Sequence, residues 1–182
     1  NRGSNAVNLS GTYTTRQWEV GLAVRQVDPD FNPEVGYLER PTFRFYNGRI
    51  LTHIRTPKLS WFREARPHIT FRQYDDTEGR PQSRLLHIDS HLLFANGSFI
   101  ELPINLVREA PDLGFEIADQ VILPPKIYDW VEWNPRFNTN LSSPVALSAE
   151  ADSGLFVVAA VAGESTASMP SPILALTSSM SS

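Results

Sequence analysis

Apolar and polar residues alternate over short stretches along most of this chain. In residues 16–25, Trp18, Val20, Leu22 and Val24 occupy every second position, and the residues between them are polar or small. Side chains two apart share a face of an extended segment. The pattern therefore predicts an antiparallel strand with one buried face.

Two Asn-Gly pairs, each flanked by alternating apolar runs, predict β-hairpins. One pair stands at positions 96–97 within residues 84–107, and the other at positions 47–48 within residues 42–55. Asn-Gly supplies the positive φ angles that tight hairpin turns require. We therefore expect a strand to end and another to begin at each pair.

The remaining pattern predicts an all-β protein. Further strands are expected at residues 68–74, 114–123, 127–133, 145–148 and 155–161. About nine or ten strands, many of them closely spaced, are typical of an antiparallel β-sandwich or jelly roll. Fourteen prolines leave room for little helix, and residues 56–67 are expected to form an irregular or one-turn helical connection. By composition the chain divides into a polar N-terminal arm (1–10), a β-sandwich domain (11–162) and a Ser-rich extended tail (163–182).

Composition narrows the function classes. The 182 residues include no cysteine, which excludes disulfides, thiolate metal sites and a cysteine nucleophile. The formal net charge of −4 favours neither nucleic acid nor an anionic membrane as a partner. No apolar run approaches the ~20 residues of a helical membrane span, so no membrane partner is expected.

His87, Asp89 and His91 are the sharpest candidates for metal binding. At i, i+2 and i+4 of a strand they point to one face, and two histidines with one carboxylate are a recognised divalent-metal set. Residues four apart on a flat strand lie ~13 Å apart, so both histidines could bind one ion only with the help of a bulge. His53 and His68, from other strands, are further candidates for this face. The alternative is simple alternation, with the intervening apolar residues Leu86, Ile88 and Leu92 facing the core.

Three acidic residues form a second candidate metal site. Asp75, Asp76 and Glu78 lie in a loop with glycine and offer the oxygen ligands that Ca²⁺ prefers, although their spacing does not match an EF-hand. A solvated turn is the favoured interpretation of these residues. Apart from Ca²⁺ at this loop, we expect no cofactor.

Trp130, Trp133, Arg136 and Phe137 form a candidate surface for binding a glycan or a protein. The alternative is that both tryptophans are core residues, one on each side of a sheet by parity. Asn-x-Ser sequons at Asn96 and Asn140 are candidate glycosylation sites. No Gly-x-Ser-x-Gly elbow or catalytic triad occurs, so we expect no enzyme.

In overall character the chain resembles a coat protein of a non-enveloped RNA virus. The resemblance depends on the N-terminal arm, the turn-linked strands from Trp18 to Val161 and the extended tail. It implies a structural protein of the virion, a capsid or capsid-surface domain, whose partners are other copies of itself or sister capsid subunits, and a host receptor or glycan. An arm with only Arg2 departs from a strongly basic genome-binding arm. Two rival hypotheses are an extracellular carbohydrate-binding or adhesin domain and a metal-dependent jelly-roll enzyme.

Overall fold

A computed structural model describes residues 4–32, 42–111, 115–118, 121–140, 142–157 and 168–180. Within these residues it contains strands and no helix, which confirms the all-β prediction. Accordingly, no helix of the described part is long and apolar enough to cross a membrane. The strands are β1 (Ala6–Thr14), β2 (Trp18–Val27), β3 (Phe43–Thr52), β4 (Phe62–Asp75), β5 (Pro81–Phe94), β6 (Phe99–Glu101), β7 (Ile104–Glu109), β8 (Phe115–Ala118), β9 (Val121–Leu123), β10 (Tyr128–Trp133), β11 (Arg136–Asn138), β12 (Val145–Val157) and β13 (Ser168–Met180).

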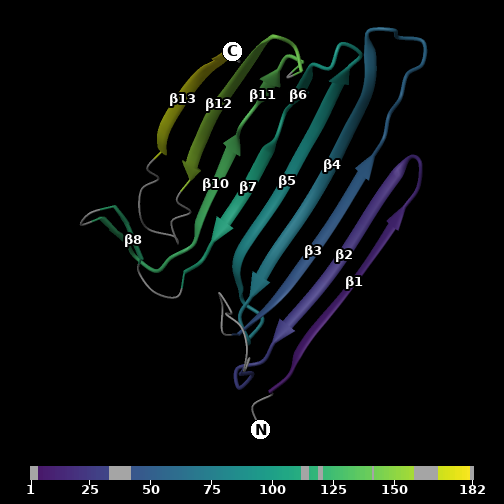
Figure 1. Ribbon diagram of the computed structural model, residues 1–182. Helices are drawn as coiled ribbons and strands as arrows, with labels where there is room; N and C mark the ends of the chain where they lie inside the picture. Colours follow the sequence, from purple (N-terminus) through teal and green to yellow (C-terminus); the bar gives the residue numbers. More distant parts are fainter. Residues whose placement is uncertain are drawn as a thin grey trace.

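Eleven strands form one antiparallel sheet in which most strands pair with a strand adjacent in the chain (Figure 1). The sheet runs from β1 at one edge to β13 at the other, and β8 pairs with β9 in a separate small sheet. The expected arm thus contributes β1 from Ala6 onward, and the expected tail contributes β13, which pairs with β12. The connections reverse the chain except at the breaks between β6 and β7 and between β10 and β11, where the chain continues in the same direction. The main sheet is therefore an up-and-down meander in a single layer.

Two prolines interrupt the far half of the sheet. Leu102 and Pro103 separate β6 from β7, and Asn134 and Pro135 separate β10 from β11. Proline cannot donate a ladder hydrogen bond. The chain therefore pairs in two separate short strands on either side of each break, β6 and β7 at the first and β10 and β11 at the second. Strand β5 accordingly pairs with β7 along its first half and with β6 near its end.

The connections at the two ends of the sheet differ in length. At one end they comprise residues 15–17, 53–61, 95–98 and 139–144. At the other end they comprise residues 28–42, 76–80, 110–127 and 158–167. The longest connections, 28–42 and 110–127, therefore share one end of the sheet.

The pairing register divides the side chains of the sheet between two chemically different faces. Directly paired residues share a face. We call the face that carries His68, opposite Asp89, the polar face. We call the other face, which carries Ile69 opposite Ile88, the apolar face.

Burial is opposite to what alternation alone predicts. On the polar face Leu51 is 4% exposed, and Phe45, His68 and Asp89 are also buried. On the apolar face Leu22 is 64% exposed. On neither face is any described side chain less than 2% exposed. The expectation that the apolar positions face the core is therefore wrong. Leu51 on the polar face is shielded from solvent, whereas Leu22, the same residue type, is exposed on the apolar face. We therefore infer that the sheet curves toward the polar face.

The Asn-Gly hairpin at positions 96–97 is confirmed. Strands β5 and β6 are joined through Ala95, Asn96 and Gly97, and the Gly97 N–H donates to the Phe94 carbonyl at 3.1 Å. Gly97 has φ +85°, in the left-handed region that glycine adopts without strain. Local turn chemistry and the alternating flanks agree at this site, so the turn forms as the sequence predicts.

The other Asn-Gly pair forms no turn. Strand β3 runs straight through Asn47 and Gly48, which pair with β2 on one side and β4 on the other. Two long neighbouring ladders outweigh the local turn preference here. The expected helical connection at 56–67 is also wrong beyond residue 61, because β4 begins at Phe62. The strands expected at 145–148 and 155–161 are joined as β12 up to Val157, and the one expected at 114–123 is the β8–β9 pair.

Gly97→Ala should destabilise the β5–β6 hairpin. A Cβ at this position would lie 2.9 Å from the Cγ of Asn140, and alanine would also carry the strain of a positive φ. We expect the free energy of unfolding to fall by about 1–2 kcal/mol, measured by urea denaturation. Gly21→Ala is the matched control, because nothing lies within 4 Å of a Cβ there and its φ is not positive. Equal losses in the two variants would contradict the strained turn.

Candidate functional site

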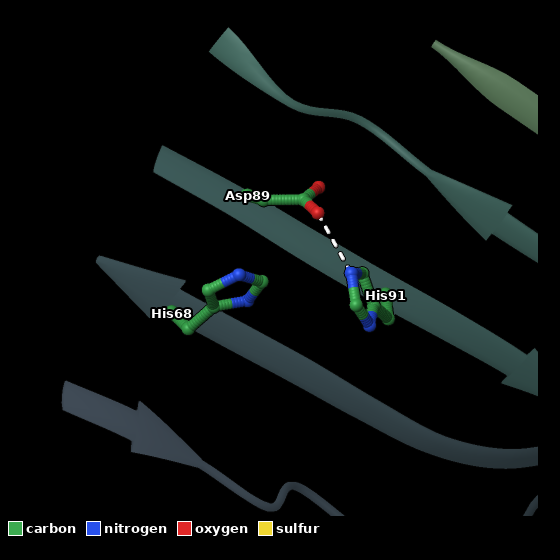
Figure 2. A group of neighbouring side chains, drawn as sticks. All are labelled: His68, Asp89 and His91. Atoms are coloured by element: carbon green, nitrogen blue, oxygen red, sulfur yellow. Dashed lines mark ion pairs between the residues drawn. The ribbon is translucent and has the colours of Figure 1, made fainter. Parts of the chain in front are cut away.

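A histidine–carboxylate cluster lies at the centre of the polar face. His68 projects from β4, and Asp89 and His91 project from β5 (Figure 2). One ligand atom from each of the three residues lies within 4.8 Å of the others. The predicted common face of His87, Asp89 and His91 is thus present, and the pairing of His68 with Asp89 supplies a neighbour from another strand.

The two oxygens of Asp89 have separate roles. Oδ1 accepts hydrogen bonds from the backbone N–H groups of Ser90 at 2.6 Å and Leu102 at 2.9 Å. Leu102 lies in the break before Pro103, where its N–H lacks a ladder partner. Oδ2 faces the cluster, 2.8 Å from Nε2 of His91 and 4.0 Å from Nε2 of His87. The backbone therefore fixes a buried carboxylate with one oxygen directed at the histidines.

His68 and His87 direct nitrogens of the same kind at each other. Nδ1 of His68 lies 3.2 Å from the Arg66 carbonyl oxygen, and Nδ1 of His87 lies 2.7 Å from Oδ1 of Asn105. Both partners accept, so each Nδ1 carries the proton, and each Nε2 of a neutral ring has a lone pair. These two Nε2 atoms are 3.2 Å apart. Two lone pairs at that distance repel unless a cation or an additional proton lies between them.

A chain of hydrogen bonds fixes the orientation of Asn105. Its amide nitrogen donates to Oε2 of Glu132 at 3.3 Å, and Oε1 of Glu132 accepts from the indole of Trp130 at 2.6 Å. A carboxylate can only accept, so the amide nitrogen of Asn105 must face Glu132 and its oxygen must face His87. Residues of β7 and β10 thereby set the tautomer of His87.

The surroundings of His68 favour its neutral imidazole. Burial is the largest cause and lowers the pKa of His68; the Arg66 carbonyl and Asp89 act against it, and His91 and His87 act in the same direction as burial. His91 is partly exposed, and its Nε2 lies 3.7 Å from Oε1 of Glu101. A neutral histidine with a free nitrogen is the form that binds a metal ion.

A second network on the polar face surrounds Glu64 of β4. The Glu64 side chain is only 4% exposed, and its Oε1 contacts Nδ1 of His53, Nη2 of Arg55 at 3.3 Å and Nε of Arg66 at 3.1 Å. Burial alone would raise the pKa of Glu64, but hydrogen bonds from Arg66 and His53 and the nearby charges lower it to about 2. Hydrogen bonds with Glu64 and Glu19 raise the pKa of His53. The network is an internally paired set of charges and joins β3 and β4 to β2.

The acidic loop between β4 and β5 uses its carboxylates within the turn. Asp76 accepts the backbone N–H groups of Glu78 at 2.8 Å and Arg80 at 2.9 Å, and its other oxygen pairs with Nε of Arg80 at 2.6 Å. The backbone hydrogen bond from Arg80 is the main cause that lowers the pKa of Asp76. Asp75 accepts from Gln73. These contacts match the turn interpretation and leave the calcium hypothesis without support from the geometry.

The candidate aromatic surface is divided between the two faces. Trp130 pairs with Val107 on the polar face, whereas Trp133 pairs with Ile104 on the apolar face, where it is 48% exposed. The predicted parity is confirmed, but the expectation of a core position is wrong for Trp133. Phe137 also lies on the apolar face, and Arg136 pairs on the other side with Glu101 and Glu150. The four residues do not form one binding surface.

The two sequons differ in accessibility. Asn96 is exposed in the hairpin turn, where its Oδ1 accepts the Ser98 N–H at 3.0 Å. Asn140 is half-buried, accepts the Ser142 N–H at 2.9 Å and lies close to Gly97. Asn96 is therefore the more accessible of the two side chains.

The apolar face is the second candidate functional surface. Alternation alone would place its apolar residues in a protein core. One row across the sheet consists of Tyr13, Val20, Ile50, Ile69, Ile88, Ile104 and Trp133. The next row includes Leu22, Phe71, Leu86, Leu106 and Val131. Toward the end with the long connections the same face becomes polar, with Gln73, Arg84, Arg108 and Asp129 in one row. The exposed apolar residues thus form a band with a defined polar border.

Comparisons with protein-family models, curated proteins and solved structures find no match for this chain. The functional conclusion therefore depends on the geometry of the two faces.

Proposed function

We propose that this chain is a membrane-embedded sheet whose apolar face contacts lipid acyl chains. The observation that carries the proposal is the exposed apolar band, which crosses seven paired strands without a charged side chain in its two central rows. Contiguous exposed apolar surface of this extent marks an interaction site in a stable protein. A partner without charge or hydrogen-bonding groups suits it.

On β2 the height of the apolar band approaches that of a bilayer. On β2 the apolar positions run from Trp18 to Val24, about 20 Å at ~3.4 Å per residue. Lipid-facing bands of membrane strands are about 25 Å tall, and a spanning strand needs about 9–11 residues. Strands β1, β2 and β3 contain 9, 10 and 10 residues, and β4 and β5 contain 14 each.

The two faces divide as a membrane sheet requires. Apolar side chains occupy the two central rows of one face, and the ionisable residues of the adjoining rows, among them Glu19, Arg49, His68 and Glu132, share the opposite face. Arg84, Arg108 and Asp129 lie on the apolar face only at the border of the band. Alternation of lipid-facing apolar and inward polar residues is the pattern of membrane-spanning strands. The two longest connections, residues 28–42 and 110–127, share one end of the sheet, and long connections at one end are also part of that pattern.

Curvature favours lipid over a second protein layer. Most of the buried strand residues lie on the polar face, so we infer that the apolar face is the convex one. Two convex faces contact each other only along a narrow strip, whereas acyl chains adapt to a curved surface. A β-sandwich, in which another sheet or a second copy covers the apolar face, is the main alternative, and it includes the coat-protein hypothesis. In lipid, the edges β1 and β13 need further strands or protein cover, because unpaired backbone groups are costly there.

Tryptophan fluorescence on β10 provides a direct test. Two single-tryptophan chains, each with the other three tryptophans replaced by phenylalanine, would retain Trp133 on the apolar face or Trp130 on the polar face. After reconstitution into vesicles of phosphatidylcholine with brominated acyl chains, we expect Trp133 emission to be quenched several-fold more than Trp130 emission. Trp130 is a matched control because it lies on the same strand.

Equal quenching of the two tryptophans, or quenching of neither, would contradict the lipid-facing assignment. In that case light scattering in detergent-free buffer would separate the alternatives. A stable dimer or larger oligomer would favour a sandwich between copies and the assembly function that the sequence suggests.

A further inference from the structure

We propose that His68, Asp89 and His91 form a binding site for a divalent transition metal ion, for which Zn²⁺ is the probe. This site lies on the polar face and is independent of what covers the apolar face. Two imidazoles and one carboxylate are the ligand types that Zn²⁺ and other borderline divalent ions prefer. Their ligand atoms already lie within 4.8 Å of one another.

The distances require only small side-chain movements. Four ligands at ~2.0–2.1 Å from a tetrahedral ion lie ~3.3 Å apart. Nε2 of His91 and Oδ2 of Asp89 are 2.8 Å apart, and Oδ2 lies 4.0 Å from Nε2 of His87. The ligand atoms of His68, Asp89 and His91 lie within 4.8 Å of one another, so each pair has to approach by at most about 1.5 Å to reach this spacing.

Hydrogen bonds with the backbone orient His68 and Asp89 for metal binding. The Arg66 carbonyl takes the Nδ1 proton of His68, and two backbone N–H groups hold Oδ1 of Asp89. These contacts fix the imidazole tautomer and direct the second carboxylate oxygen inward, which is the usual arrangement around metal ligands. His68 and Asp89 are both buried, so their geometry is restricted by packing.

The facing nitrogens of His68 and His87 give an independent reason to expect a cation. Their Nδ1 atoms are both donors to oxygen, and their Nε2 lone pairs face each other at 3.2 Å. A metal ion beside them would remove this repulsion by taking the lone pair of His68. His87 then lies at the border of the site with a third nitrogen, while Glu101 faces His91 from the other side.

The test is zinc binding by the full 182-residue chain, purified in EDTA and dialysed, followed by calorimetric titration with ZnCl₂. We expect one equivalent to bind. His91→Gln and Asp89→Asn should each weaken binding at least about tenfold. Asp89→Asn retains the oxygen that accepts the two backbone amides, so it separates loss of the ligand from loss of the fold.

His53→Gln is the matched control, since it removes the one histidine that lies outside the cluster. Its zinc affinity should stay within about twofold of the unaltered chain. Co²⁺ gives a second readout, because four-coordinate Co²⁺ absorbs visible light much more strongly than the hydrated ion. The site is overturned if the unaltered chain binds no zinc, or if His91→Gln and His53→Gln weaken binding equally. Neither result bears on the lipid-facing assignment, which the quenching experiment tests separately.

Discussion

Glu64→Gln is expected to lower the free energy of unfolding by about 2–3 kcal/mol. The Glu64 carboxylate is buried and receives hydrogen bonds from His53, Arg55 and Arg66 through a single oxygen. An uncharged amide at this position leaves the surrounding cations without their shared counter-charge. The measurement is urea denaturation of both chains, followed by circular dichroism under the same solvent conditions.

Glu150→Gln is the control for an exposed ion pair. Glu150 pairs with Arg136 at 2.7 Å, but both side chains are largely accessible to solvent. Exposed pairs contribute about 0–1 kcal/mol, so this variant should lose much less stability than Glu64→Gln. Equal losses would mean that burial of Glu64 does not determine its contribution.

The same network predicts the pH dependence of stability. The pKa of Glu64 is about 2 in the folded chain, below its ordinary value of 4.5, so its contribution is present above pH 4.5 and is lost as the pH falls toward 2. The pKa of His53 is raised above 6.5, so its contribution is present below pH 6.5 and is lost as the pH rises through the folded value. Glu64→Gln should therefore flatten the acid limb of the stability profile, and His53→Gln should flatten the alkaline limb.

Features that depend on neighbouring residues could be predicted from the sequence. The turn at Gly97 and the common face of His87, Asp89 and His91 follow from local turn chemistry and the two-residue period of a strand. Features that depend on pairing could not. Gly48 lies in mid-strand because β2 and β4 flank it, and no local signal encodes that register.

The candidate metal site shows the same limit. Sequence spacing places Asp89 and His91 on one strand face but cannot say which residue of β4 lies opposite, and that residue is His68. The roles of Arg66, Leu102 and Asn105 around the ligands also depend on the three-dimensional register. The Pro103 break could have suggested an unpaired N–H nearby, although not the carboxylate that accepts it.

Which face is covered is the property that alternation leaves undetermined. A strand such as β2 shows an apolar and a polar face whether the apolar side meets a protein core or a lipid bilayer. Simple alternation would place Ile88 in the core, and the structure instead buries Asp89 on the opposite face. Length, net charge and the lack of a long apolar run do not separate the two cases, because membrane strands carry a weak signal per segment.

Leu22→Arg should therefore prevent or strongly impair folding into lipid vesicles. Leu22 is 64% exposed and lies in a central row of the apolar band, so an arginine there would have to enter the hydrocarbon region. The expected cost is about 2–4 kcal/mol near the bilayer midplane. The measurement is the folded fraction after reconstitution into phosphatidylcholine vesicles over a urea series.

Thr12→Arg is the matched control because it adds the same charge on the polar face. Thr12 pairs with Gly21, beside which a Cβ would meet nothing within 4 Å, so an arginine has space there. We expect it to change the folded fraction little, by less than about 0.5 kcal/mol. If Leu22→Arg folds into vesicles as well as Thr12→Arg does, the apolar face is not in contact with lipid. Loss of a detergent-free oligomer in Leu22→Arg alone would then identify a second copy as its partner.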